Sequence, residues 1–257
     1  MPSISIAIAT HNPVKEWLQR ALDSCAGVDE IVLCNDGSAQ FDRAEYRFPA
    51  GVRANVLHNE KNVGSFKSYT IAVSHATGEW ISTPGDDDYY DAAAFPHLLA
   101  RLKVTEADIV YYPCRTFGKS ETIMGRHPAL TYRMLLKRNR IYGGSFFRRR
   151  VWDFLEGYQL ESSADWDFWL RAFKSGFVFE YFPLVCGHYR ITDRSMFEHQ
   201  AKALGRENLA RLVRAHAARW KKIHRRRGNR ITAALWKAGA FLFRPSKYFP
   251  VVIHMVM

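Results

Sequence analysis

The sequence predicts an α/β fold with a Rossmann-like, doubly wound and mostly parallel sheet, followed by an amphipathic helical extension at the C-terminus. In the first half of the chain, short apolar segments of strand length alternate with segments of helical periodicity. In residues 200–257, apolar residues recur at helical spacing among many basic ones. The 257 residues are 47% hydrophobic and 24% charged, which permits a large core and excludes a disordered chain or a disulfide scaffold.

The expected elements follow from apolar runs, helical spacing and turn residues. In the first half, we expect strands at residues 4–9, 30–34, 52–57 and 78–84, and helices at residues 14–22 and 65–75. In the second half, we expect strands at 108–112 and 178–181, helices at 131–137, from 148 and from 165 to the glycine at 176, and a return loop at 184–193. Residues 1–105, 106–198 and 199–257 are the three expected parts of the chain.

The positive charge is concentrated in the tail. Residues 200–257 carry 14 Lys and Arg and one acid, Glu207, so their net charge is +13, whereas residues 1–199 carry −1. A basic tail on a neutral body favours attachment to an anionic membrane surface over nucleic-acid binding. The alternative is a solvated helical face that packs on the body. The two apolar stripes are Leu209, Leu212, Val213, His216, Trp220 and Ile223, and then Ile231, Ala234, Leu235, Ala238, Phe241 and Leu242.

The cysteines and the N-terminus indicate the compartment. Cys25, Cys34, Cys114 and Cys186 form no C-x-x-C pair, which favours buried structural thiols in a reduced compartment. The first apolar run is too short for a signal peptide, and no run has the roughly 18–20 apolar residues of a membrane span. We therefore expect a cytoplasmic protein, peripheral on the inner face of the cell membrane.

Polar residues follow three of the expected strands. They are Thr10-His11-Asn12, Asn35-Asp36-Gly37-Ser38 and Gly85-Asp86-Asp87-Asp88. Because ligands of doubly wound sheets bind beyond the carboxyl ends of the strands, we expect these residues to border one crevice. Such a crevice suits a nucleotide and a divalent cation.

The three aspartates favour a cation, since adjacent carboxylates repel and raise one another's pKa. Magnesium or manganese relieves that repulsion through oxygen ligands. The alternative is an Asp-rich turn in which Asp88 caps the next helix.

The other motifs also have structural interpretations. Asn35–Ser38 is either a tight turn or a site where Asp36 accepts from a ribose hydroxyl or a base N–H. Asn62-Val63-Gly64 is by default a turn. Lone histidines such as His11 and His58, and the aromatic face of Trp166, Trp169 and Phe173, are more often structural than functional.

Together, the motifs resemble glycosyltransferase family 2, the inverting nucleotide-sugar transferases of the GT-A fold. The resemblance covers roughly residues 3–195, and its motifs occur in the family's order. They are Ser3–Pro13, Asn35–Ser38, Asn62–Gly64, Gly78–Ile81, Gly85–Tyr89, Gly144–Arg149, Gly157-Tyr158 and Ala164–Arg171.

The resemblance implies a role for each matching residue. Asp165 is the expected catalytic base, and Asp87 and Asp88 are the expected metal ligands. The expected nucleotide-binding residues are Thr10, His11, Asn12, Asp36, Asn62, Gly64, Lys67 and Asp86. The residues expected to contact acceptor or diphosphate are Gly144, Ser145, Trp166, His188, Arg190 and Arg194.

Two positions depart from the family pattern. Tyr69-Thr70 replace an Arg-Asn pair that often follows the N-x-G loop. Lys61 or Lys67 is expected to supply the positive charge of the absent arginine. Thr192 replaces a late histidine, for which His188 or Arg194 is expected to compensate.

The resemblance thus implies a metal-assisted inverting transfer, in which Asp165 deprotonates an acceptor hydroxyl and the cation offsets charge on the leaving group. The implied donor is a UDP-, dTDP- or GDP-sugar. The implied acceptor is a glycan or lipid-linked molecule in bacterial lipopolysaccharide, O-antigen, capsule or exopolysaccharide synthesis. Alternatives are a non-catalytic nucleotide- or glycan-binding module with a membrane-tethering tail, and a nucleotidyltransferase. The latter usually has a Gly-rich loop that Thr10–Pro13 does not provide.

Overall fold

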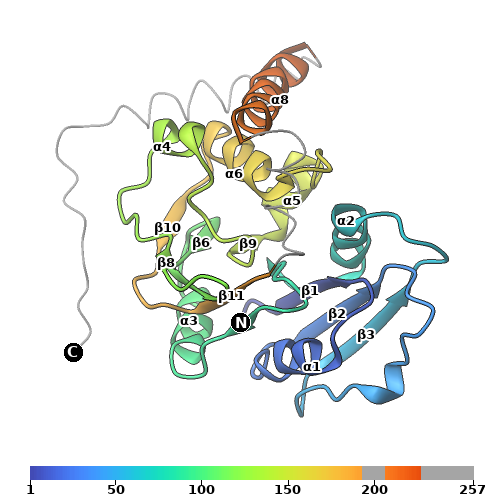
Figure 1. Ribbon diagram of the computed structural model, residues 1–257. Helices are drawn as coiled ribbons and strands as arrows, with labels where there is room; N and C mark the ends of the chain where they lie inside the picture. The colour runs from blue at the N-terminus through green and yellow to red at the C-terminus, as the bar shows by residue number, and fades with distance from the viewer. Residues whose placement is uncertain (193–205, 227–257) are drawn as a thin grey trace. The chain divides into compact units, whose positions relative to one another are not determined.

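The computed structural model describes residues 1–192 and 206–226 (Figure 1). Residues Met1–Ala217 form one compact unit. The strands are β1 (Ile4–Thr10), β2 (Glu30–Asn35), β3 (Arg53–His58), β4 (Trp80–Ser82), β5 (Tyr89–Tyr90), β6 (Ile109–Tyr111), β7 (Cys114–Gly118), β8 (Ile123–Met124), β9 (Phe146–Arg148), β10 (Phe179–Tyr181) and β11 (Gly187–Ile191). The helices are α1 (Lys15–Asp23), α2 (Ser65–His75), α3 (Phe95–Leu102), α4 (Tyr132–Lys137), α5 (Arg149–Leu155), α6 (Ala164–Lys174) and α8 (Arg206–Arg226), with a 3-10 turn at Arg43–Glu45.

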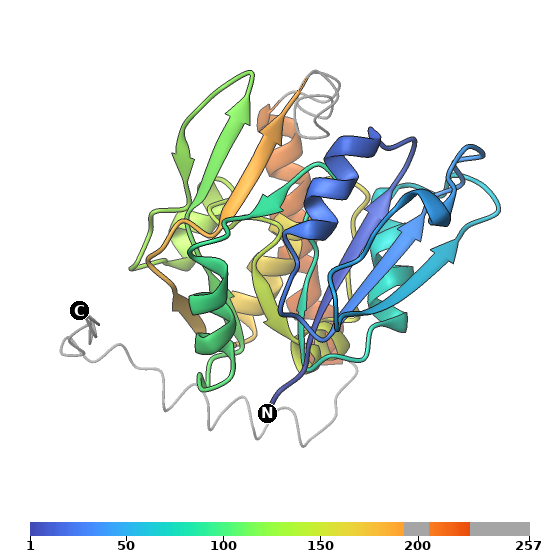
Figure 2. The ribbon, with the colours of Figure 1, turned by 90° about the horizontal axis from the view of Figure 1, so that it is seen from below.

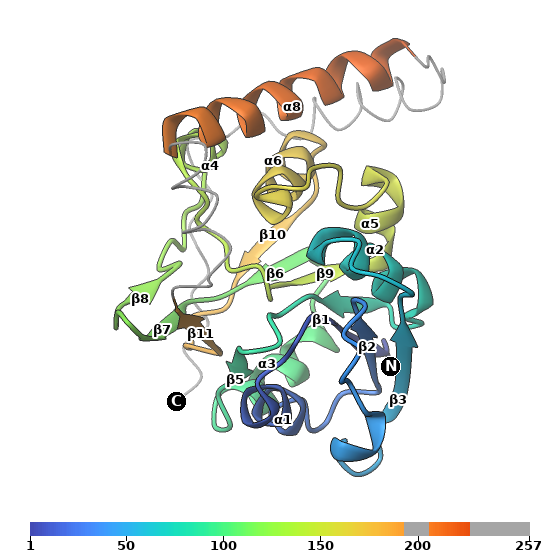
Figure 3. The same cartoon turned by 45° about the vertical axis from the view of Figure 1, so that its right-hand side comes forward.

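The central sheet has seven strands in the order β10-β6-β9-β4-β1-β2-β3. All of its pairs are parallel except those of β9, which runs antiparallel between β4 and β6. Helices α1 and α3 cover one face, and α2, α5 and α6 cover the other (Figure 3). Because both faces are covered, β1 and β2 are buried along their whole length, as their continuous apolar runs predict. The doubly wound, mostly parallel α/β fold is therefore confirmed.

Register brings the polar strand ends together. Thr10 pairs with Asn35 across β1 and β2, and β4 lies on the other side of β1. The side chain of Trp80 in β4 is fully buried and donates through Nε1 to the carbonyl oxygen of Leu102 in α3. The buried Trp80 therefore anchors β4, the strand that leads to the crevice, against α3.

The prediction of a loop at 184–193 is wrong, because Gly187–Ile191 forms strand β11. A second sheet has the order β5-β11-β7-β8, visible in Figure 2 as the orange and green arrows. Strand β11 pairs in parallel with β7, with His188 opposite Arg115. The helix expected from Arg148 is present as α5 and begins one residue later, because the unexpected strand β9 ends at Arg148. Such short strands are hard to predict from sequence. They contain no long apolar run, and they form because they pair with distant segments.

The beginning of α8 packs on the body. Ala210, Val213 and Ala217 are buried, whereas Leu212, which belongs to the expected apolar stripe, is exposed. Nη1 of Arg214 donates to the carbonyl oxygen of Leu136 in α4. For residues 206–217 the structure thus shows the alternative of a packed helix, and the second expected helix, 231–242, lies outside the described residues.

Among the described residues, no helix has the length and apolar character needed to cross a bilayer. All four cysteines are free and buried, as expected.

Candidate active site

The polar ends of β1, β2 and β4 meet in one place. Oγ1 of Thr10 donates to Oδ2 of Asp86 at 2.5 Å, so the end of β1 is joined to the loop after β4. The backbone N–H of Asn12, which has a left-handed φ of 48°, donates to Oγ of Ser38 at 2.7 Å. Nδ1 of His11 lies 2.8 Å from the carbonyl oxygen of Asp36. The convergence expected from the sequence is confirmed.

Asp36 organises the loop before α2. Its carboxylate accepts from the backbone N–H of Val63 at 2.8 Å and of Gly64 at 3.0 Å, and from Nδ2 of Asn59 at 3.0 Å. Burial acts to raise the pKa of Asp36, but these donors outweigh it and hold the pKa below its usual value. Asp36 is therefore ionised and held in place at the crevice.

Gly37 allows the two loops to touch. Its φ is +72°, and a Cβ there would lie 2.4 Å from the backbone of Lys61 and Asn62. Only glycine accommodates both the left-handed backbone and this approach. The Asn35–Ser38 motif thus also packs against the backbone of the loop before α2.

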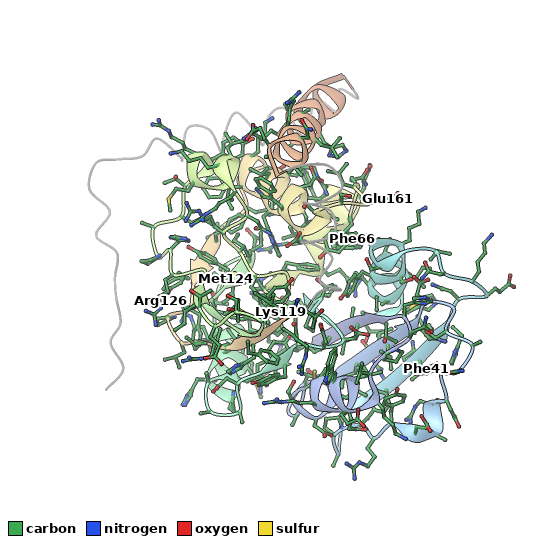
Figure 4. All side chains as sticks on the ribbon, in the orientation of Figure 1. Phe41, Phe66, Lys119, Met124, Arg126 and Glu161 are labelled. Atoms are coloured by element: carbon green, nitrogen blue, oxygen red, sulfur yellow. The ribbon has the colours of Figure 1, made fainter. Side chains whose placement is uncertain are left out.

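A cavity of about 450 Å³ opens beside this loop. It is lined by Asn62, Val63, Gly64, Ser65, Phe66, Lys67 and Glu161. Phe66 from α2 and Glu161 from the segment before α6 lie close together (Figure 4). Nζ of Lys67 forms an ion pair with Glu161 at 3.1 Å, and both side chains are exposed. The predicted nucleotide-binding residues Asn62, Gly64 and Lys67 therefore share one cavity.

A second cavity, of about 320 Å³, lies on the other side of Asn12 and Ser38. Phe41 and Tyr46, which line it, stack with ring centroids 5.3 Å apart. The Asn12–Ser38 contact therefore stands at the edge of an aromatic hollow.

The three aspartates have different surroundings. Asp88 is 3% exposed, and its carboxylate accepts from three donors: the N–H of Gly85, the hydroxyl of Tyr142 and the N–H of Arg190. Asp86 is half-buried and accepts from Thr10, while Asp87 is half-buried beside the guanidinium of Arg190. The helix-cap alternative for Asp88 is excluded, because Asp91 accepts from the N–H groups of Ala93 and Ala94 before α3.

Burial raises the pKa of all three carboxyls. The pKa of Asp86 rises to about 7, and that of Asp88 rises to about 8 through burial and the charge of Asp87. The pKa of Asp87 is also raised by burial, although the positive charge of Arg190 lowers it. Simultaneous ionisation of the three carboxyls is therefore disfavoured unless a positive charge joins them.

The oxygen donors of this cluster fit a hard divalent cation. Asp86 and Asp87 retain acceptor capacity, and a cation that keeps waters and binds diphosphate oxygens needs few protein ligands. Within residues 1–192 and 206–226, no group of three metal-ligating His, Cys, Asp or Glu side chains is present. A magnesium or manganese ion at this site would therefore depend on substrate oxygens.

Tyr142 connects the aspartates to the second half of the site. Its hydroxyl donates to Asp88 at 2.8 Å, and its ring lies between two glycines. A Cβ on Gly144 would lie 2.5 Å from the Tyr142 ring, and one on Gly187 would lie 2.9 Å from it. The predicted site residue Gly144 thus serves the close packing of Tyr142.

Asp165 lies in the first turn of α6, as expected. Nδ2 of Asn139 donates to its Oδ2 at 2.7 Å, and a Cβ on Gly143 would lie 3.5 Å from the same oxygen. Burial raises the pKa of Asp165, while donation from Asn139 and from the backbone of Trp166 lowers it in part. Because Gly143 adjoins Tyr142, the candidate base and the aspartate cluster border one site.

Asp167 faces away from this site, as the helical rotation predicts. It is fully buried and pairs with the fully buried Arg171 at 2.7 Å. Its other oxygen lies 2.8 Å from Nδ1 of His216 in α8. Two carboxylates in one helical turn therefore have separate environments.

Ser145 and Trp166 are not brought to the surface of the site. Ser145 is fully buried, and Trp166 donates from Nε1 to the carbonyl oxygen of Leu135. These two members of the expected acceptor or diphosphate set belong to the interior.

Arg190 is the basic residue that reaches the aspartates. Its Nε donates to the carbonyl oxygen of Asp87 at 3.3 Å, and its guanidinium lies over the rings of Trp17 and Phe117. His188 instead stacks on Tyr89 and lies 3.2 Å from Asp91. Arg194 lies outside the described residues.

Four residues of the site were given no role by sequence reasoning. They are Asn139, Tyr142, Glu161 and Tyr158, the last of which belongs to the Gly157-Tyr158 motif. Tyr158 lies 2.8 Å from Oγ1 of Thr83, which also bonds the carbonyl oxygen of Gly143. The adjacent glycines at 143 and 144 are a signal that something packs closely there, but no pattern in the sequence identifies the Tyr142 ring as that neighbour.

Comparison with known proteins finds related glycosyltransferases. The chain is 28% identical, over 92% of its length and 98% of theirs, to the PGL/p-HBAD biosynthesis glycosyltransferases of Mycobacterium bovis and Mycobacterium tuberculosis. It is 26% identical over 66% of its length, and 68% of the relative, to the glycosyltransferase YwdF of Bacillus subtilis.

The fold is similar to that of S. aureus TarS 1–349 in complex with UDP-GlcNAc. The TM-score is 0.62 at 16% identity, covering 76% of this chain and 60% of TarS 1–349. The chain thus spans about three fifths of that protein's length. The sequence profile described as glycosyl transferase family 2 matches residues 5–199. The chain belongs to glycosyltransferase family 2.

Proposed function

We propose that the protein is an inverting glycosyltransferase that moves a sugar from a nucleotide donor to a membrane-presented acceptor, with Asp165 as the base. One observation carries the proposal. The hydroxyl of Tyr142 donates to Asp88, and the backbone of the next residue, Gly143, lies against Asp165. A leaving group held by the aspartates and an acceptor hydroxyl near Asp165 would therefore border the same few residues.

The surroundings of Asp165 suit proton transfer. An inverting displacement needs one carboxylate to take the acceptor proton while the hydroxyl oxygen attacks the anomeric carbon. The raised pKa of Asp165 strengthens it as a base, and the bond from Asn139 fixes its orientation. Its position in the first turn of α6 favours the ionised form that can accept the proton.

At the aspartate cluster, Asp86 and Asp87 are the residues that would hold a divalent cation. Asp88, one of the two ligands expected from the sequence, already accepts from three protein donors and instead supports the loop. When bound, magnesium or manganese would neutralise charge on the departing nucleoside diphosphate. Arg190 places a second positive charge beside Asp87, in the role expected of His188 or Arg194.

The donor we favour is a UDP-sugar. The structural neighbour TarS has been crystallised with UDP-GlcNAc and with UDP. In this chain, the ionised Asp36 and the cavity along Asn62–Lys67 provide acceptors and space at the strand ends. We assign residues 1–105 to the donor and residues 106–198 to the acceptor and base.

The acceptor we propose is a glycan or lipid-linked molecule of bacterial cell-surface glycan synthesis. The mycobacterial relatives are named PGL/p-HBAD biosynthesis glycosyltransferases, which supports an acceptor in a biosynthetic pathway. The basic tail beyond Ala217 would hold the enzyme at the cytoplasmic face of the membrane, where such acceptors are presented.

A donor screen by thermal unfolding tests the proposal. UDP-, dTDP- and GDP-sugars are added with and without manganese. At a concentration near 100 times Kd, the correct donor should raise Tm by about 5–10 °C. Asp87→Asn should remove the manganese-dependent part of this shift, whereas the exposed Asp153→Asn should retain it.

Product analysis then separates catalysis from binding alone. Transfer to lipid-linked acceptors from bacterial membranes supports the proposal. Donor stabilisation without transfer or donor hydrolysis would instead identify a non-catalytic nucleotide-binding module. Absence of stabilisation by every sugar nucleotide would contradict the donor assignment.

A further inference from the structure

The neutral body of the protein has a strongly polarised charge. Residues 115–140 contain seven Lys and Arg and one acid, Glu121, so their net charge is +6. The rest of residues 1–199 carries −7. Near-neutrality of the body as a whole therefore conceals one basic segment, which comprises β7, β8, the following loop and α4.

Most of these basic side chains face solvent. The exposed ones are Arg115, Lys119, Arg126, Arg133, Lys137 and Arg138. In the part of the chain that the structure describes, the side chains of Arg115, Arg126, Arg133, Lys137 and Arg138 form no ion pair or hydrogen bond with the protein. Folding thus concentrates these charges without neutralising them.

The basic residues belong to one surface. Arg115 lies opposite Ile123 in the β7–β8 hairpin, and Nη1 of Arg140 lies 2.8 Å from Nε2 of His127. Burial and the nearby guanidinium groups of Arg140 and Arg138 hold the pKa of His127 below its usual value. The end of the segment thus folds back on its middle, and β8 and α4 lie on the same side of the molecule in Figures 1 and 3.

Exposed apolar side chains accompany the charges. Met124, on β8 at the edge of the second sheet, is 39% exposed, and Figure 4 shows it between Lys119 and Arg126. Leu212 of α8 is 47% exposed, and α8 is joined to α4 through Arg214 and Leu136. Basic side chains around exposed apolar ones are typical of surfaces that lie on a bilayer. A phosphate backbone would pair with the arginines but would leave Met124 and Leu212 in water.

We propose that the surface formed by β7, β8, the following loop, α4 and the exposed start of α8 binds an anionic lipid bilayer directly, in addition to the tail. We call it the basic face. The remaining body, with its net negative charge, is repelled by the same bilayer. The basic face therefore orients the body, whereas a tail alone would only tether it.

Charge-neutralising pairs of substitutions test the basic face in the full-length protein. One variant combines Arg115→Gln with Arg126→Gln, and another combines Arg133→Gln with Lys137→Gln. The matched control combines Arg47→Gln with Lys103→Gln, two exposed basic residues outside the basic face. Binding is measured by co-sedimentation with vesicles of phosphatidylglycerol and phosphatidylcholine, and with phosphatidylcholine alone.

Each basic side chain near an anionic leaflet contributes about a fivefold change in binding. Each basic-face pair should therefore weaken binding to the anionic vesicles by about 25-fold, and the control pair by less than about twofold. Wild-type affinity in both basic-face pairs, or an equal loss in the control, would overturn the proposal. Loss of affinity for duplex DNA with unchanged vesicle binding would overturn it too, and would assign the face to nucleic acid.

The basic face rests on the proposed function, because both concern a membrane-presented substrate. The two proposals are nevertheless tested by different measurements, vesicle binding and donor-dependent stabilisation. None of the four basic-face residues contacts the candidate site, so donor-dependent thermal stabilisation should be unchanged in both pairs. Loss of vesicle binding with intact donor stabilisation supports the basic face. Intact vesicle binding without donor stabilisation by any sugar nucleotide would contradict only the transferase assignment.

Discussion

The Asp86–Asp88 cluster and the Asp165–Asp167 pair divide their carboxylates in the same way. In each, one carboxylate is fully engaged by the protein and another borders the crevice. Asp88 has three donors and Asp167 has Arg171 and His216, whereas Asp87 and Asp165 retain acceptor capacity. Hydrogen-bond partners, more than position in a motif, thus separate structural carboxylates from those available for chemistry.

Backbone geometry produces this division differently in the two places. In α6, two residues correspond to about 200° of rotation, so Asp165 and Asp167 point to opposite sides. After β4, the loop turns Asp88 inward to Tyr142 and leaves Asp86 and Asp87 half-buried. The comparison predicts that the engaged members affect stability and the available members affect chemistry.

The largest expected effect on stability is that of Asp167→Ala. This change leaves the fully buried Arg171 guanidinium without its carboxylate, and breaking a buried pair costs about 3–5 kcal/mol of unfolding free energy. Urea denaturation measures it, with Asp153→Ala as the exposed control. A loss below about 1 kcal/mol would show that Asp167 is not the structural member of its pair.

Gly144→Ala should have an intermediate effect. The new methyl group would overlap the Tyr142 ring, and overpacking costs about 1–3 kcal/mol. The neighbouring Gly143→Ala is the control, since its methyl group would lie at an ordinary 3.5 Å from Asp165. Equal unfolding midpoints for the two variants would contradict the close packing of Tyr142.

The smallest expected effect is a shift in pH dependence. As a base, Asp165 must be ionised, so kcat/KM falls as the pH drops through its raised pKa. Asn139→Ala removes a donor that lowers this pKa, so the acid limb of the pH profile should move to higher pH. An unchanged limb, or a shift to lower pH, would remove Asn139 from this role. The control variant Asn55→Ala, on β3, should leave the acid limb of the kcat/KM profile at the wild-type pH.

The sequence predicts the regular part of the fold well because β1 and β2 are continuous apolar runs and α1 has apolar residues at helical spacing. It also predicts that Thr10, Asp36 and Asp86 converge, since parallel strands bring their carboxyl ends to one edge. The motif also predicts Asp165 in the first turn of α6, although the N-cap Ser163 forms no side-chain hydrogen bond to the helix.

The rest depends on contacts between distant segments. Strand β11 forms because Gly187–Ile191 pairs with β7, which lies some seventy residues earlier, and its own pattern of residues is irregular. Asp88 differs from Asp87 through its donors, two of which, the hydroxyl of Tyr142 and the N–H of Arg190, come from distant segments. The basic face is hidden in the sequence because its charge cancels against acids elsewhere in the body.

The most direct test compares Asp165→Asn with Asp167→Asn in both transfer rate and unfolding midpoint. Asp165→Asn should lower kcat by about 10²–10⁴-fold while donor binding and the midpoint stay near wild type. Asp167→Asn should lower the midpoint and retain most of the transfer rate per folded molecule. Undiminished transfer by Asp165→Asn would contradict its role as the catalytic base.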